Sequence, residues 1–266
     1  MKSGLFLSTL VAATFPLTLP AQQAPNGYHT VTCIKLKPGK TFADYRHWAA
    51  EGPHKLQQAN ADSGRISAWY LLGYVMPAGT SAACDFVNVS IYPGSPPAPL
   101  GLEGLGAALK KAGMTMGTKE YVDQRSSMAE LVFAELWQNW NAVGTLQKGD
   151  YVVLNHMKVP NVGDWLAYEK KMWQPFAEAM VKDGVMHGWF LNTPVYPGGT
   201  DLKYQATTVD VYPSWDALFK DDGFAERFKK VHPGADMNQT MASFEKLRTI
   251  GSLEVLSVED VVVPAK

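Results

Sequence analysis

Residues 28–36 read YHTVTCIKL, and residues 151–159 read YVVLNHMKV. Both stretches begin with Tyr and end with Lys and an aliphatic residue. Their residue types alternate with the period of two that is typical of a β-strand. The second stretch begins 123 residues after the first (151 − 28 = 123). The pair predicts that the chain contains the same structural unit twice.

The match continues downstream of both stretches. Phe42 and Tyr45 recur as Trp165 and Tyr168 at the same offset, and the offset then falls to 120 (184 − 64 = 120). Gly64, Trp69, Leu71, Pro77, Gly79-Thr80, Val89 and Tyr92-Pro93 match Gly184, Trp189, Leu191, Pro197, Gly199-Thr200, Val209 and Tyr212-Pro213. An ordered series of this kind indicates an internal repeat.

Each copy reads as strand, helix, strand, strand, helix, strand. The predicted strands before the last helix are residues 28–36, 66–75 and 86–92, and residues 151–159, 186–191 and 206–212. The first helix of copy two is amphipathic, with apolar residues three and four apart from Trp165 to Met180. Both copies close with an Arg and then an apolar strand that contains a Glu, Arg125 before Glu130 and Arg248 before Glu254.

This order is the βαββαβ arrangement of ferredoxin-like folds. The sequence therefore predicts an α+β protein of two tandem ferredoxin-like repeats, at residues 28–139 and 150–263, with a linker at residues 140–150.

The N-terminus has the pattern of a secretory signal peptide. Lys2 precedes a mostly apolar run at residues 5–19, and Ala21 offers a cleavage point before polar residues. A membrane anchor is the alternative, but the run is short for a bilayer and Pro16 interrupts it. We expect residues 1–21 to be removed and the protein to be exported, to the periplasm or outside the cell, with no membrane attachment afterwards.

Composition excludes several kinds of partner. The 266 residues carry a formal net charge of −1 and 18% charged residues, without a basic stripe, so nucleic acid is not an expected partner. The two cysteines, Cys33 and Cys84, are too far apart in sequence for a C-x-x-C metal or redox motif. In an oxidising compartment they could pair, and the sequence leaves that open. The methionine-rich stretches lack a neighbouring His or Cys, so we expect no metal site and no cofactor.

The opening of copy one, Lys35-Leu36-Lys37-Pro38-Gly39-Lys40, the aromatic helix and the Arg…Glu closing strand resemble the dimeric α+β barrel superfamily. That superfamily includes antibiotic-biosynthesis monooxygenases, EthD-like and NIPSNAP-like proteins and haem-binding chlorite dismutases. The resemblance implies that the two sheets face each other as an α+β barrel and enclose a pocket. The catalytic residues of these families cannot be matched one by one to residues of this sequence.

Strand alternation then predicts which side chains face that pocket. On the first strands, Ile34 and Met157 suit the helix side, which leaves Cys33 and His156 inside. On the third strands, the apolar set of Val87, Val89, Ile91, Val209 and Val211 is expected under the helices. The other face of those strands would then line the pocket.

We therefore predict His156 and Asp210 as candidate catalytic residues, because a His–carboxylate pair suits proton transfer near neutral pH. The candidate ligand-binding residues are Lys35, Lys158, Asn88, Ser90, Tyr92, Tyr212 and His187. The alternative for His156 is a hydrogen-bonded structural histidine, and Asp210 and Lys158 could form a simple ion pair. Trp69 and Trp189 are expected in the core.

Three classes of function remain. The first is an exported protein that binds a small molecule between its sheets, with a cofactor-free oxygenase-like enzyme as the specific form. The second is a haem protein of the chlorite-dismutase kind, with His156 or His187 as the axial ligand. The third is a non-catalytic structural or interaction module, for which a filled interior would be the sign. The sequence leaves enzyme activity undecided, and a homo-oligomer stays open.

Overall fold

Both copies of the repeat fold in the predicted order, in a computed structural model that describes residues 27–79, 82–199, 201–220 and 223–265. The expected signal peptide at residues 1–21 lies outside the described residues. Copy one contains β1 (Gly27–Leu36), α1 (Phe42–Glu51), α2 (Pro53–Asp62), β2 (Ala68–Met76), β3 (Phe86–Tyr92), α3 (Leu102–Lys111), α4 (Thr118–Met128) and β4 (Ala129–Gly144). Copy two contains β5 (Tyr151–Lys158), α5 (Val162–Tyr168), the π-helical turn η2 (Glu169–Trp173), α6 (Gln174–Lys182), β6 (Gly188–Tyr196), β7 (Ala206–Tyr212), the short 3₁₀ turn η3 (Asp216–Leu218), α7 (Phe224–Val231), α8 (Met237–Leu247) and β8 (Thr249–Val262).

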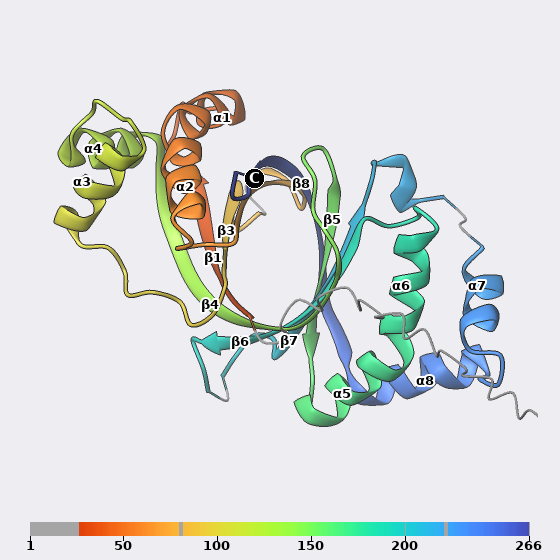
Figure 1. The fold of residues 1–266 in the computed structure, drawn as a ribbon. Helices are drawn as coiled ribbons and strands as arrows, with labels where there is room; N and C mark the ends of the chain where they lie inside the picture. Colours follow the sequence, from red (N-terminus) through yellow and green to blue (C-terminus); the bar gives the residue numbers. More distant parts are fainter. Residues whose placement is uncertain (1–26, 80–81, 200, 221–222, 266) are drawn as a thin grey trace, which may run out of the picture.

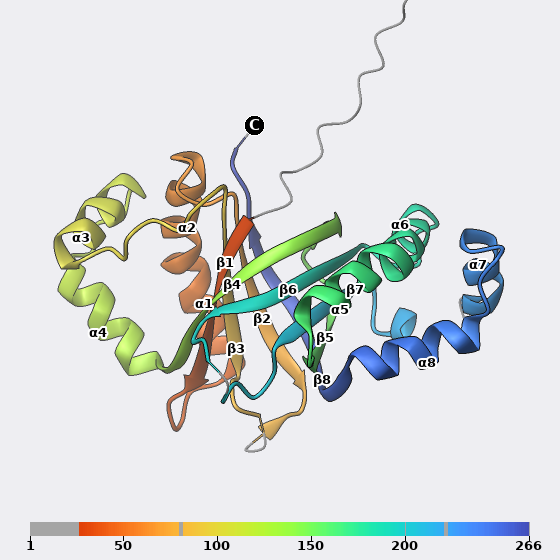
Figure 2. The same ribbon diagram turned by 90° about the horizontal axis from the view of Figure 1, so that it is seen from below.

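The eight strands form a single closed barrel in the order β1-β3-β2-β8-β5-β7-β6-β4, and every neighbouring pair is antiparallel. Helices α1 to α4 lie on one side of it and α5 to α8 on the other (Figure 1). The view from below shows the same two helix layers flanking the strands (Figure 2). The predicted α+β fold of two facing repeats is confirmed.

The last strand of each copy joins the two copies together. Strand β4 pairs with β1 of its own copy and with β6 of the other, and β8 pairs in the same way with β5 and β2. Because β4 continues to Gly144, the linker is residues 145–150 and not residues 140–150. Neither copy closes a barrel by itself.

Local sequence signals explain where the first helices begin. Thr41 caps α1 because its side-chain oxygen accepts a hydrogen bond from the Asp44 backbone N–H, and the Asp44 carboxylate accepts one from the Thr41 backbone N–H. Asn161 caps α5 by accepting a hydrogen bond from the Asp164 backbone N–H through its side-chain oxygen. None of the helices in the described parts of the chain is long and apolar enough to cross a membrane.

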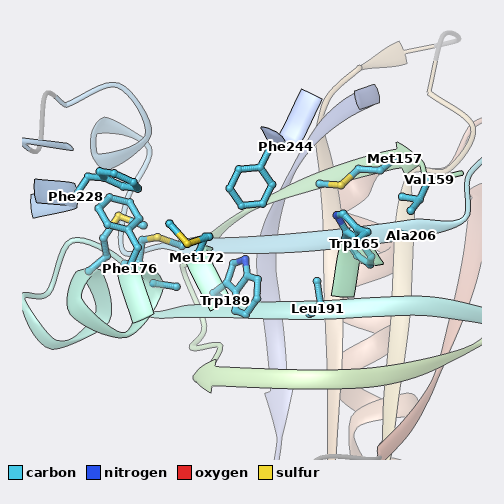
Figure 3. Close-up of a cluster of buried hydrophobic side chains, with 13 residues drawn as sticks. Met157, Val159, Trp165, Met172, Phe176, Trp189, Leu191, Ala206, Phe228 and Phe244 are labelled. Atoms are coloured by element: carbon cyan, nitrogen blue, oxygen red, sulfur yellow. The ribbon is translucent and has the colours of Figure 1, made fainter. Parts of the chain in front are cut away.

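Three apolar clusters hold the sheet and its helix layers together, and a fourth, smaller one of Leu56, Leu109 and Tyr121 joins the helices of copy one. One lies between the first helix layer and the sheet, around Tyr45, Trp69 and Phe86. A larger one lies under the second helix layer and includes Trp165, Phe176 and Trp189 (Figure 3). Trp69 and Trp189 are 1% and 0% exposed, which confirms the prediction that both belong to the core. The third cluster draws residues from all eight strands, and therefore fills the barrel.

Candidate functional site

The barrel interior is occupied largely by apolar side chains. The buried members of its cluster are Cys33, Leu72, Cys84, Val87, Val152, Val211, Leu256 and Val258. Tyr74 packs against this cluster and also reaches a group of ionisable and aromatic side chains. That polar group, rather than an open chamber between sheets, is the candidate functional site.

Glu254 on β8 is the centre of the polar group. Its Oε2 accepts a hydrogen bond from the Tyr74 hydroxyl at 2.8 Å and lies 3.3 Å from His156 Nε2. The other ring nitrogen of His156, Nδ1, is 3.2 Å from Thr207 Oγ1. Since Tyr74 comes from copy one and the others from copy two, the site exists only when both copies are folded together.

A row of aromatic rings runs beside Glu254. The Tyr204 ring stacks on His156 with centroids 4.2 Å apart, and it stacks on Trp137 at 5.7 Å. Trp137 in turn donates from Nε1 to Glu135 Oε2 at 2.9 Å and lies 6.5 Å from the His29 ring. Two carboxylates therefore border a stack of flat side chains, a combination suited to a planar ligand with a hydrogen-bond donor.

The environment sets the protonation of these groups. Burial alone would raise the pKa of Glu254, but hydrogen bonds from His156 and Tyr74 outweigh it and hold the pKa below its ordinary value. Burial, followed by the charge of Glu254, raises the pKa of Tyr74. Burial and the charges of Glu135 and Glu254 raise the pKa of Tyr204. The site therefore presents an ionised carboxylate beside hydroxyls that stay protonated.

The two copies differ at equivalent positions in this region. Cys33 corresponds to His156 (156 − 33 = 123), and Cys84 corresponds to Tyr204 (204 − 84 = 120). Cys33 and Cys84 form a buried disulfide, whereas His156 and Tyr204 stack without a covalent bond. Copy one is thus locked where copy two carries the ionisable pair.

Glu135 and Glu254 are also equivalent. Glu135 pairs with Val31 and Glu254 with Leu154, and these partners are 123 residues apart (154 − 31 = 123). Their strands, β4 and β8, are four places apart in the eight-stranded ring. The repeat therefore points one carboxylate into the barrel from each of two opposite sides.

A surface hollow of about 480 Å³ reaches one of these carboxylates. Its lining consists of Thr30, Phe133, Ala134, Glu135, Leu136, Tyr196 and Pro197. It lies where β4 continues past the end of β6, since Leu136 pairs with Tyr196, the last residue of that strand. Glu135 is thus the point at which a ligand from solvent would first meet the polar group.

The structure corrects the predicted faces of the third strands. Val87 and Val211 fill the barrel, whereas Phe86, Tyr92, Ala206 and Tyr212 pack under the helices. Asn88, Ser90 and Asp210 alternate with the valines, so they too lie on the helix side. The prediction that Asn88, Ser90, Tyr92, Asp210 and Tyr212 line the interior was wrong because both faces of these strands are buried, so an apolar set does not mark the helix side.

The first-strand assignment was correct for Cys33 and His156, and not for Lys158, which is exposed. Cys33 and His156 face the interior, with Ile34 and Met157 under the helices. Lys35 forms an ion pair with Asp85 at 2.9 Å and donates to Ala82 O at 3.0 Å, so it ties β1 to the loop before β3. Lys158 is exposed and borders a second hollow of about 390 Å³.

His187 lies apart from the polar group. Its Nδ1 is 2.9 Å from Asp150 Oδ1, and Asp150 is 2% exposed at the end of the linker between the copies. Asp210 and His156, the predicted catalytic pair, lie on opposite faces of the sheet. Among the described residues, no three or more His, Cys, Asp or Glu side chains gather as a metal site would require.

Comparisons with known proteins bear on the fold. No protein-family model matches the chain, and a search of curated proteins finds no match. A candidate monooxygenase from Fusobacterium nucleatum subsp. nucleatum aligns with a TM-score of 0.54 at 10% identity, covering 90% of this chain and 95% of that one. A candidate monooxygenase from Lactobacillus acidophilus aligns with a TM-score of 0.51 at 10% identity, covering 90% and 97%. The chain has the dimeric α+β barrel fold.

A chlorite dismutase from Candidatus Nitrospira defluvii is more distant, with a TM-score of 0.47 at 9% identity over 90% of this chain and 92% of that one. In the protein described here, both halves of the barrel belong to one polypeptide. At these identities the likeness concerns the fold, and the site must be argued from its own residues.

Sequence reasoning missed most of the site. Tyr74, Glu135 and Tyr204 carry no motif, and they meet only because strands from both copies close the barrel. Glu254 had a signal, since it is a charged residue flanked by apolar residues, Leu253 and Val255, in the closing strand. A charged residue inside such a strand indicates a buried partner, which here is His156.

His29 offers a test of the burial of this region. It is 8% exposed, its Nδ1 has no hydrogen-bond partner among the described residues, and burial lowers its pKa to about 4. In the unfolded chain the His29 ring takes up a proton near pH 6.5, whereas in the folded chain it does so only near pH 4. The free energy of unfolding should therefore fall by on the order of 3 kcal/mol as pH falls from about 6.5 to about 4. We expect His29→Gln to lose less stability than the parent between pH 7 and pH 4.5 in urea unfolding. Equal losses in both proteins would contradict the burial.

Proposed function

We propose that the protein is an exported binder of a small planar molecule, with acid–base chemistry carried by Glu254 and His156. The observation that supports it most is the contact of the Glu254 carboxylate with His156 and Tyr74, because side chains of both copies meet at it inside the barrel. The disulfide at the equivalent place in copy one shows that the fold can be closed there without ionisable groups. The same disulfide supports export, since such bonds persist in oxidising compartments.

A hydroxylated aromatic compound fits the groups present. Its ring would lie beside Trp137 and Tyr204, and its hydroxyl would donate to Glu135 or Glu254. Glu254, with the His156 ring at its side, would accept the proton of that hydroxyl. Two fold neighbours with TM-scores above 0.5 are candidate monooxygenases, which supports an oxygenase-like reaction as the specific form.

The apolar filling of the barrel favours a second candidate, a non-catalytic module. In that case the contacts of Glu254 serve only to satisfy a buried carboxylate. Haem ligation by His156 receives no such support, because both of its ring nitrogens already contact protein groups.

The test is a binding screen of phenols, naphthols and catechols against the mature protein, followed by tryptophan fluorescence and calorimetry. We expect Glu254→Gln to weaken a compound that binds by about 10- to 100-fold, because a hydrogen bond to a charged group contributes about 1.5–3 kcal/mol. His156→Gln removes one of the hydrogen bonds that hold down the pKa of Glu254, so binding should be lost at a higher pH than in the parent as the solution is acidified. Glu130→Gln is the matched control, since Glu130 lies on β4 and is 63% exposed.

The outcomes separate the candidates. Binding by the parent and the control, with loss in Glu254→Gln, supports the proposed site. Binding that Glu254→Gln leaves intact places the ligand elsewhere. No binding by any compound of the panel, in a folded protein, favours the non-catalytic module.

A further inference from the structure

A second polar group lies outside the barrel, beneath the helices of copy two. Glu169 is the first residue of the π-helical turn η2 and is 1% exposed. Trp165 Nε1 donates to its Oε1 at 3.0 Å, while its Oε2 is buried and has no partner among the described residues. A buried carboxylate oxygen without a partner is costly, so it calls for a physical explanation.

Asp210 on β7 faces the same space. Asn155 Nδ2 donates to its Oδ2 at 2.7 Å, while its Oδ1 is buried and unpartnered within the described chain. Trp165, which holds Glu169, and Trp189, which lies across from Asp210, belong to the same buried cluster, and the Asp210 charge acts on Glu169 through it. Trp189, the cross-strand partner of Asp210, also points an unpartnered indole nitrogen from this face.

A single cation accompanies the two acids in the part of the chain that the structure describes. Arg248 Nε lies 3.5 Å from Glu169 Oε1, and its charge also acts on Asp210. The other groups that face the carboxylates are neutral: Trp165 from α5, Asn155 from β5, Thr208 from β7 and Trp189 from β6. With both acids ionised, this buried site would hold a net charge of −1, and the guanidinium makes it unsuited to a metal cation.

We infer that Glu169 and Asp210 together form a buried proton-binding site that holds one proton at neutral pH. A proton on one carboxyl removes one of the two buried negative charges, and the site becomes neutral with Arg248. Burial raises the pKa of Glu169 to about 7, with Asp210 adding to the rise and Arg248 opposing it. Burial raises the pKa of Asp210 to about 6, against the opposing effects of Asn155 and Arg248.

The site makes the second helix layer sensitive to alkali. The unfolded chain releases the Glu169 proton near pH 4.5, whereas the native chain keeps it to about pH 7. The contribution of Glu169 to the free energy of unfolding therefore decreases as pH rises between those values. Above pH 7 the charges repel across the contact between η2 and the sheet. Copy one has no such site, because Arg46 and Ser90 occupy the equivalent positions (169 − 46 = 123; 210 − 90 = 120).

The experiment is a carboxyl carbon-13 NMR titration of the mature protein from pH 4 to pH 9, combined with urea unfolding over the same range. We expect one carboxyl resonance to titrate near pH 7 and to disappear in Glu169→Gln. Because of this proton, the equilibrium constant for folding should fall close to tenfold per pH unit between about pH 5 and pH 7. Glu169→Gln should not show this decrease. Glu178→Gln, an exposed change on α6, is the matched control and should behave as the parent.

Asp210→Asn provides the second variant. It removes the charge that acts on Glu169, so the resonance near pH 7 should move to lower pH and remain visible. If every carboxyl of the parent titrates below pH 5, or the resonance near pH 7 survives in Glu169→Gln, the shared site is ruled out. The parent titration needs no variant, so a failure of one variant to fold leaves the inference open to refutation.

Discussion

Removing the disulfide should lower the free energy of unfolding by about 4 kcal/mol, as expected from the chain entropy of a closed loop of this length. The bond joins Cys33 and Cys84 across 51 residues, and both are 0% exposed. We expect the Cys33→Ala, Cys84→Ala double variant to show this loss in urea unfolding. The loss should come from the unfolded state, because alanine fills most of the space of each buried cysteine.

Reducing agent supplies the control for this prediction. It should destabilise the parent by a similar amount and leave the double variant unchanged. Free thiols in the native parent, or a loss below about 1 kcal/mol in the double variant, would contradict the role given to the bond.

Truncating either repeat-defining tryptophan should have an effect of the same size. Trp69 and Trp189 are equivalent (189 − 69 = 120), and each packs between its own helix layer and the sheet. We expect Trp69→Ala and Trp189→Ala each to lower the free energy of unfolding by about 3–5 kcal/mol, because each leaves a large cavity. Thermal and urea unfolding would measure both.

Phe219→Ala is the matched control, since this aromatic side chain is 72% exposed and should contribute within about 0.5 kcal/mol. A loss below about 1 kcal/mol at either tryptophan would show that the surrounding cluster can collapse around the gap. A large loss at one tryptophan only would show that the two helix layers are packed differently despite the repeat.

The fold could be predicted because its signals are local or periodic. The strands Phe86–Tyr92 and Ala206–Tyr212 were placed at their observed limits, since alternation and the following Tyr-Pro mark them. The helix from Trp165 onward was placed by its apolar spacing, although the π-helical turn within it leaves no sign in that spacing.

The site could not be predicted to the same degree. His156 was placed correctly inside the barrel, but its carboxylate partner is Glu254 and not Asp210. Alternation gives two faces without saying which one is the interior when both are buried. That choice depends on how strands from the two copies close, which is a property of the whole chain.

The pairing of β4 with β6 and of β8 with β2 has a consequence for how the protein acquires its structure. A nascent first half has no partner for part of β2 or β4, so it presents open strand edges until the second half is made. Contacts this distant in sequence form slowly, and exposed edges are prone to aggregation in the meantime. The cysteines both belong to the first half, so an oxidant could close their loop before the second half is available. Early formation of this disulfide would restrict the conformations of the first half before the second half closes the barrel.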